Sequence, residues 1–433
     1  MNKKETSYLM EKVADLQNLE AAAIKATKNR KRVTKSERYF FRNKEKCLKE
    51  LRCILLNGTY KTSKYYHFKQ YEPKERIIAV LPFYPDRIVH HAILNVTLPL
   101  WYKKYTADTY NCIKNRGTHG MVKKLKKALS EDKENTEFAL QLDVRHFYES
   151  IDHEILKQIV RRTIKDPKLL LVIFEIIDSY PNGVPIGNVL SQFLANLFLA
   201  QYDHYVKEKI GIKHYFRYCD DLLSLSSNKN KLWLLNRYTR WFMRKIKLEL
   251  KPNGRIFPTS TGIDIVGYVF YPTHTRLRKR TKQNFIRKCR KARKMGLKGR
   301  AFKHYIGSYL GLLKHANCIN LAKKYLGDEY DLCMKKFKDI ADEKDRFESY
   351  QGRKIQITDV IGVEILIHGF RNIRIGNKDK VIISADVNGE LSYFFTGSAV
   401  IMDRLNRYKH ELPFMATIEE VSNKYGRKYY TLR

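Results

Sequence analysis

Three acidic residues in two short apolar segments are the strongest chemical signal in the sequence. Asp220 and Asp221 interrupt the run from Tyr215 to Ser226, whose two apolar halves are typical of strands joined in a hairpin. Asp143 follows a second apolar run. Taken alone, the Asp220-Asp221 pair also fits a solvated turn. Three carboxylates on neighbouring strand ends, however, are costly to bury without a cation, and they could hold two Mg²⁺ ions, which prefer oxygen ligands.

The composition indicates the kind of partner. The chain has 433 residues and 43% hydrophobic residues, enough for a core and for two or three domains. It carries 84 Lys and Arg against 45 Asp and Glu, a formal net charge of +39. An excess of this size favours a polyanionic partner. The 29 tyrosines suit stacking on bases.

The cysteines and the hydropathy pattern indicate the compartment. The seven cysteines lack the paired spacing of a zinc site or a disulfide framework, which fits a reducing cytoplasm. No secretory segment and no apolar stretch long enough to span a bilayer is evident in the sequence. We therefore predict a cytoplasmic protein without a membrane partner.

Local patterns predict the elements that position the acids. Helices are expected at 16–24, at 36–56 before Asn57-Gly58, from Asp86, at 120–129, and after Ser150. Residues 67–80 predict two strands around a Pro-containing turn, with Lys74 and Arg76 on the second arm. A cationic helical region is expected over 276–294, and a linking helix over 330–350. The cations of the 276–294 region would follow a nucleic acid backbone through its phosphates.

A glycine-containing loop leads from Asn182 into a helix lined with Ser, Gln and Asn. Such a glycine-containing loop can let a base pair lie close to the backbone. An ordinary loop and helix cap fits the same spacing.

Together, these residues resemble reverse transcriptases. Asp143 with the aromatic pair Phe147-Tyr148 matches the first catalytic motif, and Tyr218-Cys-Asp-Asp221 matches the Tyr-x-Asp-Asp box. Gly262-Ile-Asp-Ile-Val-Gly-Tyr268 is similar to the primer-grip region. The resemblance spans roughly residues 10 to 330. It implies an α+β right-hand polymerase with fingers, palm and thumb.

The segment Ile186-Gly-Asn-Val-Leu-Ser-Gln192 narrows the resemblance. It is similar to the reverse transcriptases of diversity-generating retroelements, as are the segments 72–76, 86–91 and 308–316. That resemblance implies copying with errors at template adenines. Cys219 departs from the group, which commonly has Met or Ala at this position next to the primer end.

The resemblance also implies a role for each motif residue. Asp143, Asp220 and Asp221 would be catalytic and would bind two Mg²⁺ ions, for which Mn²⁺ can substitute, with Val144 in the same ligand set. The other expected sites are Lys74, Arg76, Tyr148, Gly187 and Gln192 for the dNTP; Ile186, Asn188 and Ser191 for the template; Gly267 and Tyr268 for the primer grip; and Arg278, Lys279, Arg280, Arg287 and Arg290 for the nucleic acid backbone. Tyr148 would reject the 2′-hydroxyl of ribonucleotides; the alternative is a packed palm aromatic.

Four regions are expected: a basic helical region at 1–60, fingers and palm at 61–275, a basic thumb and linker at 276–350, and a β-rich accessory domain at 351–433. In the last region, 13 Lys and Arg minus 9 Asp and Glu gives +4. Its recurring strand patterns predict a small, mostly-β domain of the OB kind that binds single strands. A structural or oligomerising module is the alternative, and the family resemblance does not cover this region.

We therefore expect an RNA-directed DNA polymerase of bacterial or phage origin, with template RNA, primer, cDNA product, dNTPs and a small basic accessory protein as partners. Two alternatives stay open. One is an antiviral defence reverse transcriptase that makes a repetitive or untemplated DNA. The other is a non-catalytic RNA-binding scaffold, against which the complete set of three acids argues.

Overall fold

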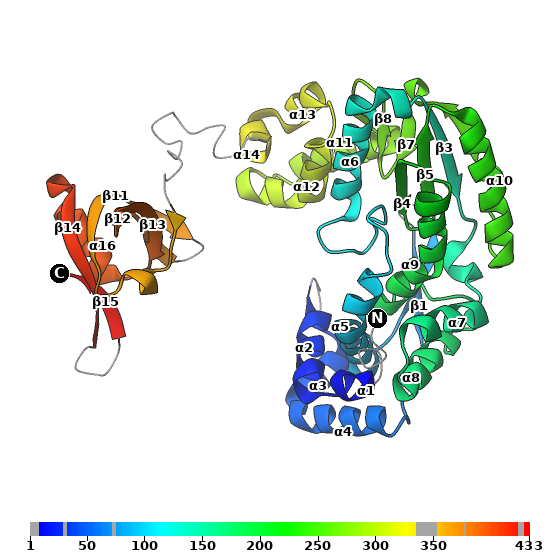
Figure 1. Ribbon diagram of the computed structural model, residues 1–433, viewed down its shortest axis with the longest axis horizontal. Helices are drawn as coiled ribbons and strands as arrows, with labels where there is room; N and C mark the ends of the chain where they lie inside the picture. The colour runs from blue at the N-terminus through cyan, green and yellow to red at the C-terminus, as the bar shows by residue number, and fades with distance from the viewer. Residues whose placement is uncertain (1–7, 29–32, 72–74, 335–352, 376–377, 423–427) are drawn as a thin grey trace. The chain divides into compact units, whose positions relative to one another are not determined.

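The structure is a computed structural model that describes residues 8–28, 33–71, 75–334, 353–375, 378–422 and 428–433. The chain divides into two compact units, residues 1–334 and 335–433, and each is described by itself. Figure 1 shows the elements of both units. Among the described helices, none has the length and apolarity that crossing a bilayer requires.

A four-stranded antiparallel sheet forms the palm of the first unit. Its strands are β3 (Phe138–Asp143), β4 (His214–Tyr218), β5 (Asp221–Ser226) and β6 (Arg255–Pro258), in the order β4-β5-β3-β6. The predicted hairpin with acids at its tip is confirmed as β4 and β5. Because strand side chains alternate, Leu140 and Leu142 of β3 enter one hydrophobic core and Ala139 enters another.

The first core is formed mainly by helices of the fingers and the palm. It includes α1 (Leu9–Val13), α2 (Leu16–Thr27), α3 (Lys35–Arg42), α4 (Lys44–Leu56), α5 (Ile88–Tyr102), α7 (His153–Thr163), α8 (Pro167–Asp178), α9 (Val189–His204) and α10 (Lys229–Lys245). The prediction of a single helix over 36–56 is wrong. The helix is interrupted at Asn43, where φ is −119° and ψ is 34°. The Asn43 side chain donates to the Tyr39 carbonyl, a local bond that competes with helix continuation.

The second core joins the palm to the thumb. It includes α6 (Gly117–Glu131), the small sheet of β7 (Ile263–Ile265), β8 (Tyr268–Phe270) and β9 (Thr275–Leu277), and the helices α11 (Lys279–Lys294), α12 (Gly299–Leu313), α13 (Ile319–Leu326) and α14 (Tyr330–Met334). The expected cationic helix therefore begins at Lys279, since Arg276 lies in β9. Most of the expected linking helix lies outside the described residues.

The fingers contribute an antiparallel hairpin of β1 (Tyr66–Gln70) and β2 (Arg76–Val80), as predicted. Residues 72–74, including Lys74, lie outside the described residues. The helix expected from Asp86 is α5, which begins at Ile88 after the turn Phe83–Arg87, where Tyr84 is extended (φ −111°, ψ 130°). Asp86 is buried and accepts hydrogen bonds from the Tyr60 hydroxyl at 2.7 Å and from the Ser63 amide at 3.0 Å.

The first unit thus has the fingers, palm and thumb of a right-hand polymerase, and the expected α+β fold is confirmed. The palm sheet lies between the two cores, one shared with the fingers and one shared with the thumb. Short helical turns complete the unit at Lys133–Asn135, Phe147–Ser150, Tyr205–Lys209, Thr259–Thr261 and Gly327–Glu329.

The second unit is a six-stranded sheet with one longer helix. Its strands are β10 (Arg353–Lys354), β11 (Glu364–Ile375), β12 (Lys378–Val387), β13 (Glu390–Thr396), β14 (Phe414–Ser422) and β15 (Lys428–Leu432), in the order β10-β13-β12-β11-β14-β15, with α16 (Ala399–Arg407) and turns at Ile357–Val360 and Lys409–Glu411. The mostly-β prediction is confirmed. The strands β11 to β15 pair in the order β13-β12-β11-β14-β15, with α16 between β13 and β14, an arrangement that is compatible with the expected OB kind, which stays a prediction.

A buried ion pair in the first unit fixes β4 to α9. Arg217 and Asp203 both have fully buried side chains, and Arg217 Nε lies 2.8 Å from each carboxylate oxygen of Asp203. The Tyr215 hydroxyl donates to the same carboxylate at 2.7 Å. Arg217 also donates to the Cys219 carbonyl at 3.2 Å, within the turn that carries Asp220. The pair therefore sets the position of that turn.

Arg217→Met should strongly destabilise the first unit, because it leaves the Asp203 charge buried without its partner. We expect a loss of about 3–5 kcal/mol in the free energy of unfolding. Lys127→Met is the control, since Lys127 and Glu131 form an exposed pair at 3.6 Å whose loss should change stability only slightly. Denaturant unfolding measures both. Similar losses for the two variants would contradict the role of the buried pair.

Candidate active site

The three predicted acids meet at one end of the palm sheet. Asp143 ends β3 and lies opposite Asp221, the first residue of β5, in the antiparallel register. Asp220 lies in the turn between β4 and β5, and its carbonyl accepts the Val144 amide at 3.3 Å. The sheet register therefore brings together residues almost 80 positions apart in the sequence, as the sequence predicted.

The site raises the pKa of two of these carboxyl groups. Burial raises the pKa of Asp221 to about 7, Asp220 and Asp143 add to the rise, and Lys251 opposes it. Burial also raises the pKa of Asp220, with Asp143 acting in the same direction and Lys251 in the opposite one. These shifts are the signature of acids that are crowded together and partly removed from water. Such clusters are typical of functional sites.

Three cations face the acids from different parts of the first unit. Lys251 forms an ion pair with Asp143 Oδ2. Arg76, at the start of β2 in the fingers, lowers the pKa of Asp220. Arg278, which caps α11 at the base of the thumb, lowers the pKa of Asp221. The fingers, palm and thumb thus each direct one positive charge at the acids.

The donor set fits a hard divalent cation. Asp143 Oδ1 is buried and, in the described part of the chain, has no hydrogen-bond partner. Three or more ligating side chains are not already gathered into a metal-binding cluster anywhere in the described residues. This is compatible with Mg²⁺, which is usually bound by one or two carboxylates together with waters and substrate phosphates. The Val144 side chain has no donor atom, so only its carbonyl could be a ligand.

Tyr148 lies beside the acidic turn. It belongs to the 3-10 turn Phe147–Ser150, and its hydroxyl lies 3.8 Å from Cys219 Sγ. Burial raises the pKa of Tyr148 and raises the pKa of the Cys219 thiol to about 12. Cys219 has a φ of +55°, a left-handed conformation that few non-glycine residues adopt. A neutral phenol ring therefore borders the turn that carries Asp220.

The glycine-containing loop packs against the fingers hairpin. The Ala79 amide of β2 donates to the Ile186 carbonyl at 2.8 Å. A Cβ on Gly187 would lie 2.3 Å from the Ala79 carbonyl oxygen, so glycine is required here for the approach of two backbones. Asn188 donates to the Tyr65 hydroxyl at 3.3 Å. This loop therefore links the palm to the fingers.

The helix that follows the loop carries the other two predicted residues. Ser191 is buried in α9, whereas Gln192 is exposed and accepts from Cys112 Sγ at 2.8 Å. Sequence reasoning missed Cys112, since an isolated cysteine carries no spacing signal.

The two residues expected in the primer grip, Gly267 and Tyr268, differ in their exposure to solvent. Tyr268 is fully buried and donates its hydroxyl to the Leu312 carbonyl of α12 at 3.1 Å, so its ring is out of reach of a primer. It connects the palm to the thumb instead. Gly267 is half-buried with a φ of +90°, and its carbonyl accepts the Arg278 amide at 3.0 Å.

The predicted thumb cations lie on or next to one helix. Arg278 precedes α11 and forms an ion pair with Asp264. Lys279, Arg280, Arg287 and Arg290 are exposed along α11, as a surface that follows phosphates requires.

Lys251 is the functional candidate that sequence reasoning missed. The alternation Leu248-Glu249-Leu250-Lys251 was a usable signal, because a period of two predicts an extended segment that ends in a cation. The structure places Leu250 in a β-bridge with Val144, next to the acids.

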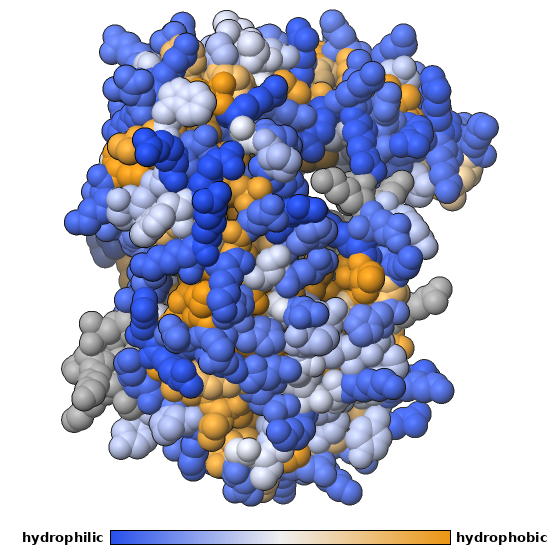
Figure 2. Space-filling view, turned by 90° about the vertical axis from the view of Figure 1, so that its right-hand side faces the viewer, coloured by the Kyte–Doolittle hydropathy of each residue, from blue (hydrophilic) through white to orange (hydrophobic). Residues whose placement is uncertain are grey.

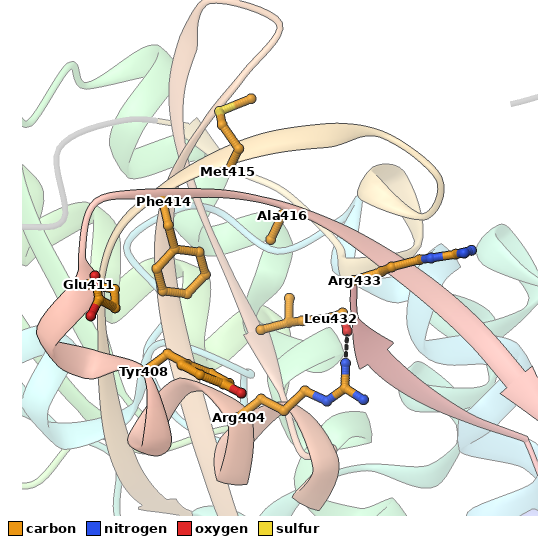
Figure 3. A pocket seen from close by; sticks show the side chains of 8 residues that line it. All are labelled: Arg404, Tyr408, Glu411, Phe414, Met415, Ala416, Leu432 and Arg433. Carbon is orange, nitrogen blue, oxygen red and sulfur yellow. Dashed lines mark hydrogen bonds between the residues drawn. The ribbon is translucent and has the colours of Figure 1, made fainter.

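The second unit has a separate pocket of about 250 Å³ between α16 and the strands β14 and β15. In Figure 3, the rings of Tyr408 and Phe414 border it, and Arg404 reaches the Leu432 carbonyl. Arg433 points away from the pocket in this view and contacts Glu419 at 3.2 Å.

Known families match both units. Residues 69–270, which include all three acids, match the family described as "Reverse transcriptase (RNA-dependent DNA polymerase)". Residues 351–433 match the family described as "Domain of unknown function (DUF8468)". The first unit is therefore similar to the reverse transcriptase family over the stretch that holds the three acids.

Two curated proteins are similar over shorter stretches. The chain is 26% identical over 140 residues to protein YkfC of Escherichia coli K12, and 22% identical over 175 residues to the group II intron-encoded protein LtrA of Lactococcus lactis. The matches cover 30% and 37% of this chain, and 37% and 28% of the two relatives. The chain thus spans well under half the length of these relatives.

Solved structures of telomerases are distantly similar. Apo telomerase from Candida tropicalis matches with 10% identity and a TM-score of 0.43, covering 66% of this chain and 60% of the other. Telomerase from Candida albicans, in complex with a fragment of telomeric RNA, matches with 11% identity and a TM-score of 0.39, covering 64% and 62%.

Gly187→Ala tests the contact between the loop and the fingers. The matched control is Gly58→Ala, because Gly58 also has a positive φ, +68°, but has open space around its Cβ. Both variants carry backbone strain of about 1–3 kcal/mol. Only Gly187→Ala adds the clash with Ala79, so it should lower the free energy of unfolding by clearly more in denaturant titrations. Equal losses would contradict the proposed reason for this glycine.

Proposed function

We propose that this chain extends a primer along an RNA template, with Asp143, Asp220 and Asp221 as the metal-binding catalytic acids. The observation that carries the proposal is the register of β3 and β5, which places Asp143 opposite Asp221 with Asp220 in the adjoining turn. The raised pKa values of Asp220 and Asp221 support it, because crowded acids of this kind are neutralised by bound cations.

Two Mg²⁺ ions would be held by these carboxylates and the Val144 carbonyl, and Mn²⁺, which accepts the same oxygen ligands, can substitute. When bound, the ions supply a lower pKa for the primer 3′-hydroxyl and charge stabilisation for the leaving pyrophosphate. Asp143 Oδ1 is already available for this role, whereas Lys251 pairs with Oδ2. Lys251 would then exchange Asp143 for the phosphates of the incoming nucleotide.

The incoming nucleotide is proposed to lie between the fingers hairpin and the acids. Arg76 is exposed at the start of β2 and acts electrostatically on Asp220, so its guanidinium could neutralise a triphosphate there. Lys74 is assigned the same role from the sequence alone. Tyr148 borders the Asp220 turn, where its ring would exclude a ribose 2′-hydroxyl. Gly187 and Gln192 complete the nucleotide-binding set.

The template is proposed to follow the loop and the thumb. Ile186, Asn188 and Ser191 border the templating base in this proposal, and Gly267 lies near the primer. The exposed cations of α11 would follow the backbone of the product duplex, so binding should weaken steeply with salt. Partners are then template RNA, primer, cDNA and dNTPs.

We further propose that the copying is error-prone at template adenines, as in diversity-generating retroelements, with a small basic accessory protein as partner. The support is the likeness of Ile186-Gly-Asn-Val-Leu-Ser-Gln192 to that group. The position of this loop against β2 gives it a physical route to fidelity, since it lies where the fingers meet the palm. An antiviral defence enzyme is the alternative.

Asp220→Asn should abolish primer extension on an RNA template and leave RNA binding largely intact. The amide keeps the size of the side chain but removes the charge that binds the metal. Glu134→Gln, which alters an exposed acid of the first unit, is the control and should retain activity. Extension by Asp220→Asn within about tenfold of the parent chain, a difference of only about 1.4 kcal/mol, would contradict the two-metal assignment.

Tyr148→Val should raise the ratio of ribonucleotide to deoxyribonucleotide incorporation. The smaller side chain opens space beneath the sugar, and the 2′-hydroxyl is the only difference available there. Tyr148→Phe, which keeps the ring, should leave the ratio unchanged. The measurement is primer extension with each nucleotide set. If the ratio of ribonucleotide to deoxyribonucleotide incorporation is unchanged in Tyr148→Val, Tyr148 only packs in the palm and does not select the sugar.

Sequencing of cDNA from a template of known sequence tests fidelity. We expect frequent misincorporation at adenines, because tenfold in discrimination corresponds to only about 1.4 kcal/mol of contact energy. Ile186→Arg or Ile186→Gln should reduce these errors by changing the contact with the templating base. Rare errors, or errors spread evenly over the four template bases, would reject the diversification role in favour of the defence alternative.

A further inference from the structure

Helix α10 exposes two of the three tryptophans of the chain. The exposed fractions of Trp233 and Trp241 are 56% and 55%, whereas Trp101 is fully buried. Leu234, beside them, is 60% exposed. The opposite face of α10 packs on β3 and β5, so the helix needs no second apolar face for its own stability. Large aromatic side chains left in solvent mark an interaction surface.

The same helix is strongly cationic. Its sequence contains no Asp or Glu and has cations at Lys229, Lys231, Arg237, Arg240, Arg244 and Lys245. Lys245 Nζ lies 5.3 Å from the centre of the Trp241 ring. Figure 2 faces this side of the molecule and shows pale and orange side chains interleaved with blue ones. Aromatic rings and positive charges therefore alternate on this face.

Two rings of this face, Tyr238 and Trp241, have aromatic neighbours. Tyr238 stacks on Tyr205, with ring centres 3.8 Å apart and an angle of 11° between the planes. Tyr238 also contacts Trp241, with ring centres 5.4 Å apart. Trp233 and Trp241 are eight residues apart, which corresponds to about 12 Å along the helix. The surface thus presents two exposed tryptophan rings, one of them packed against Tyr238, over a length that several stacked bases can follow.

We propose that this α10 surface, formed by Trp233, Leu234, Arg237, Tyr238, Trp241 and Lys245, binds single-stranded RNA outside the active site. Bases stack on the tryptophan rings while Arg237 and Lys245 contact phosphates, the combination that sequence-tolerant single-strand binding uses. A protein partner fits less well, because the centres of protein interfaces are depleted of charge, whereas here cations stand one helical turn from each ring.

The proposal extends the proposed function by naming a second RNA contact, for the strand that flanks the copied template. It does not depend on catalysis. Binding is therefore measured without divalent metal or dNTPs, on the full chain saturated with a blunt RNA–DNA duplex that would occupy the proposed active site. A failure of polymerase activity and a failure of this surface then give separate results.

The first test uses tryptophan fluorescence. Because Trp101 is buried, quenching by added oligouridylate reports on Trp233 and Trp241. We expect oligouridylate to quench the emission and heparin, a polyanion without bases, to leave it nearly unchanged. Equal quenching by both would show binding by charge alone and would overturn the stacking proposal.

The second test uses the anisotropy of labelled oligouridylate. The double variant Trp233→Ala/Trp241→Ala should bind about tenfold more weakly, whereas Trp233→Phe/Trp241→Phe should retain most of the affinity. Leu171→Ala, which removes a leucine that is 62% exposed on α8, is the control and should bind as the parent does. Unchanged affinity in the double Ala variant, or its conversion from an oligomer to a monomer in light scattering with RNA affinity retained, would overturn the proposal.

Discussion

The active site depends on keeping three carboxylates together where water is partly excluded. Burial and, after it, repulsion by the neighbouring acids raise the pKa of Asp220 and of Asp221. The fold compensates with cations from three directions, Arg76 of the fingers, Lys251 of the palm and Arg278 at the base of the thumb. The charge state of the acids therefore depends on residues of the fingers, the palm and the thumb.

The palm can hold the three acids close together because both faces of its sheet are packed. One core extends into the fingers and the other into the thumb, so the ends of the strands are fixed from two sides. Arg217 and Asp203 then fix the turn itself, through the bond from Arg217 to the Cys219 carbonyl. Gly187 permits the close contact of the loop with Ala79, which ties the fingers hairpin to the same frame.

The sequence predicted what depends on local pattern. The hairpin with Asp220 at its tip and the position of Asp143 follow from short apolar runs, and the structure confirms them. It could not predict what depends on contacts between distant segments. Lys251 reaches Asp143 only through the extended segment beside Val144, and Tyr268 is buried with its hydroxyl donating to the Leu312 carbonyl of α12.

One further difference has a local origin, and one feature depends on strand pairing. The break at Asn43 is decided by one side-chain bond within an otherwise helical pattern. The strand order of the second unit is decided by pairings such as β11 with β14, which no local pattern specifies.

The most direct test of the account is the product that the purified chain makes on RNA templates of different length and sequence, with Mg²⁺ and all four dNTPs. The account predicts DNA whose length follows the template and whose sequence is its complement, apart from the expected changes at adenines. DNA of a sequence that does not depend on the template, or no DNA at all, would contradict it.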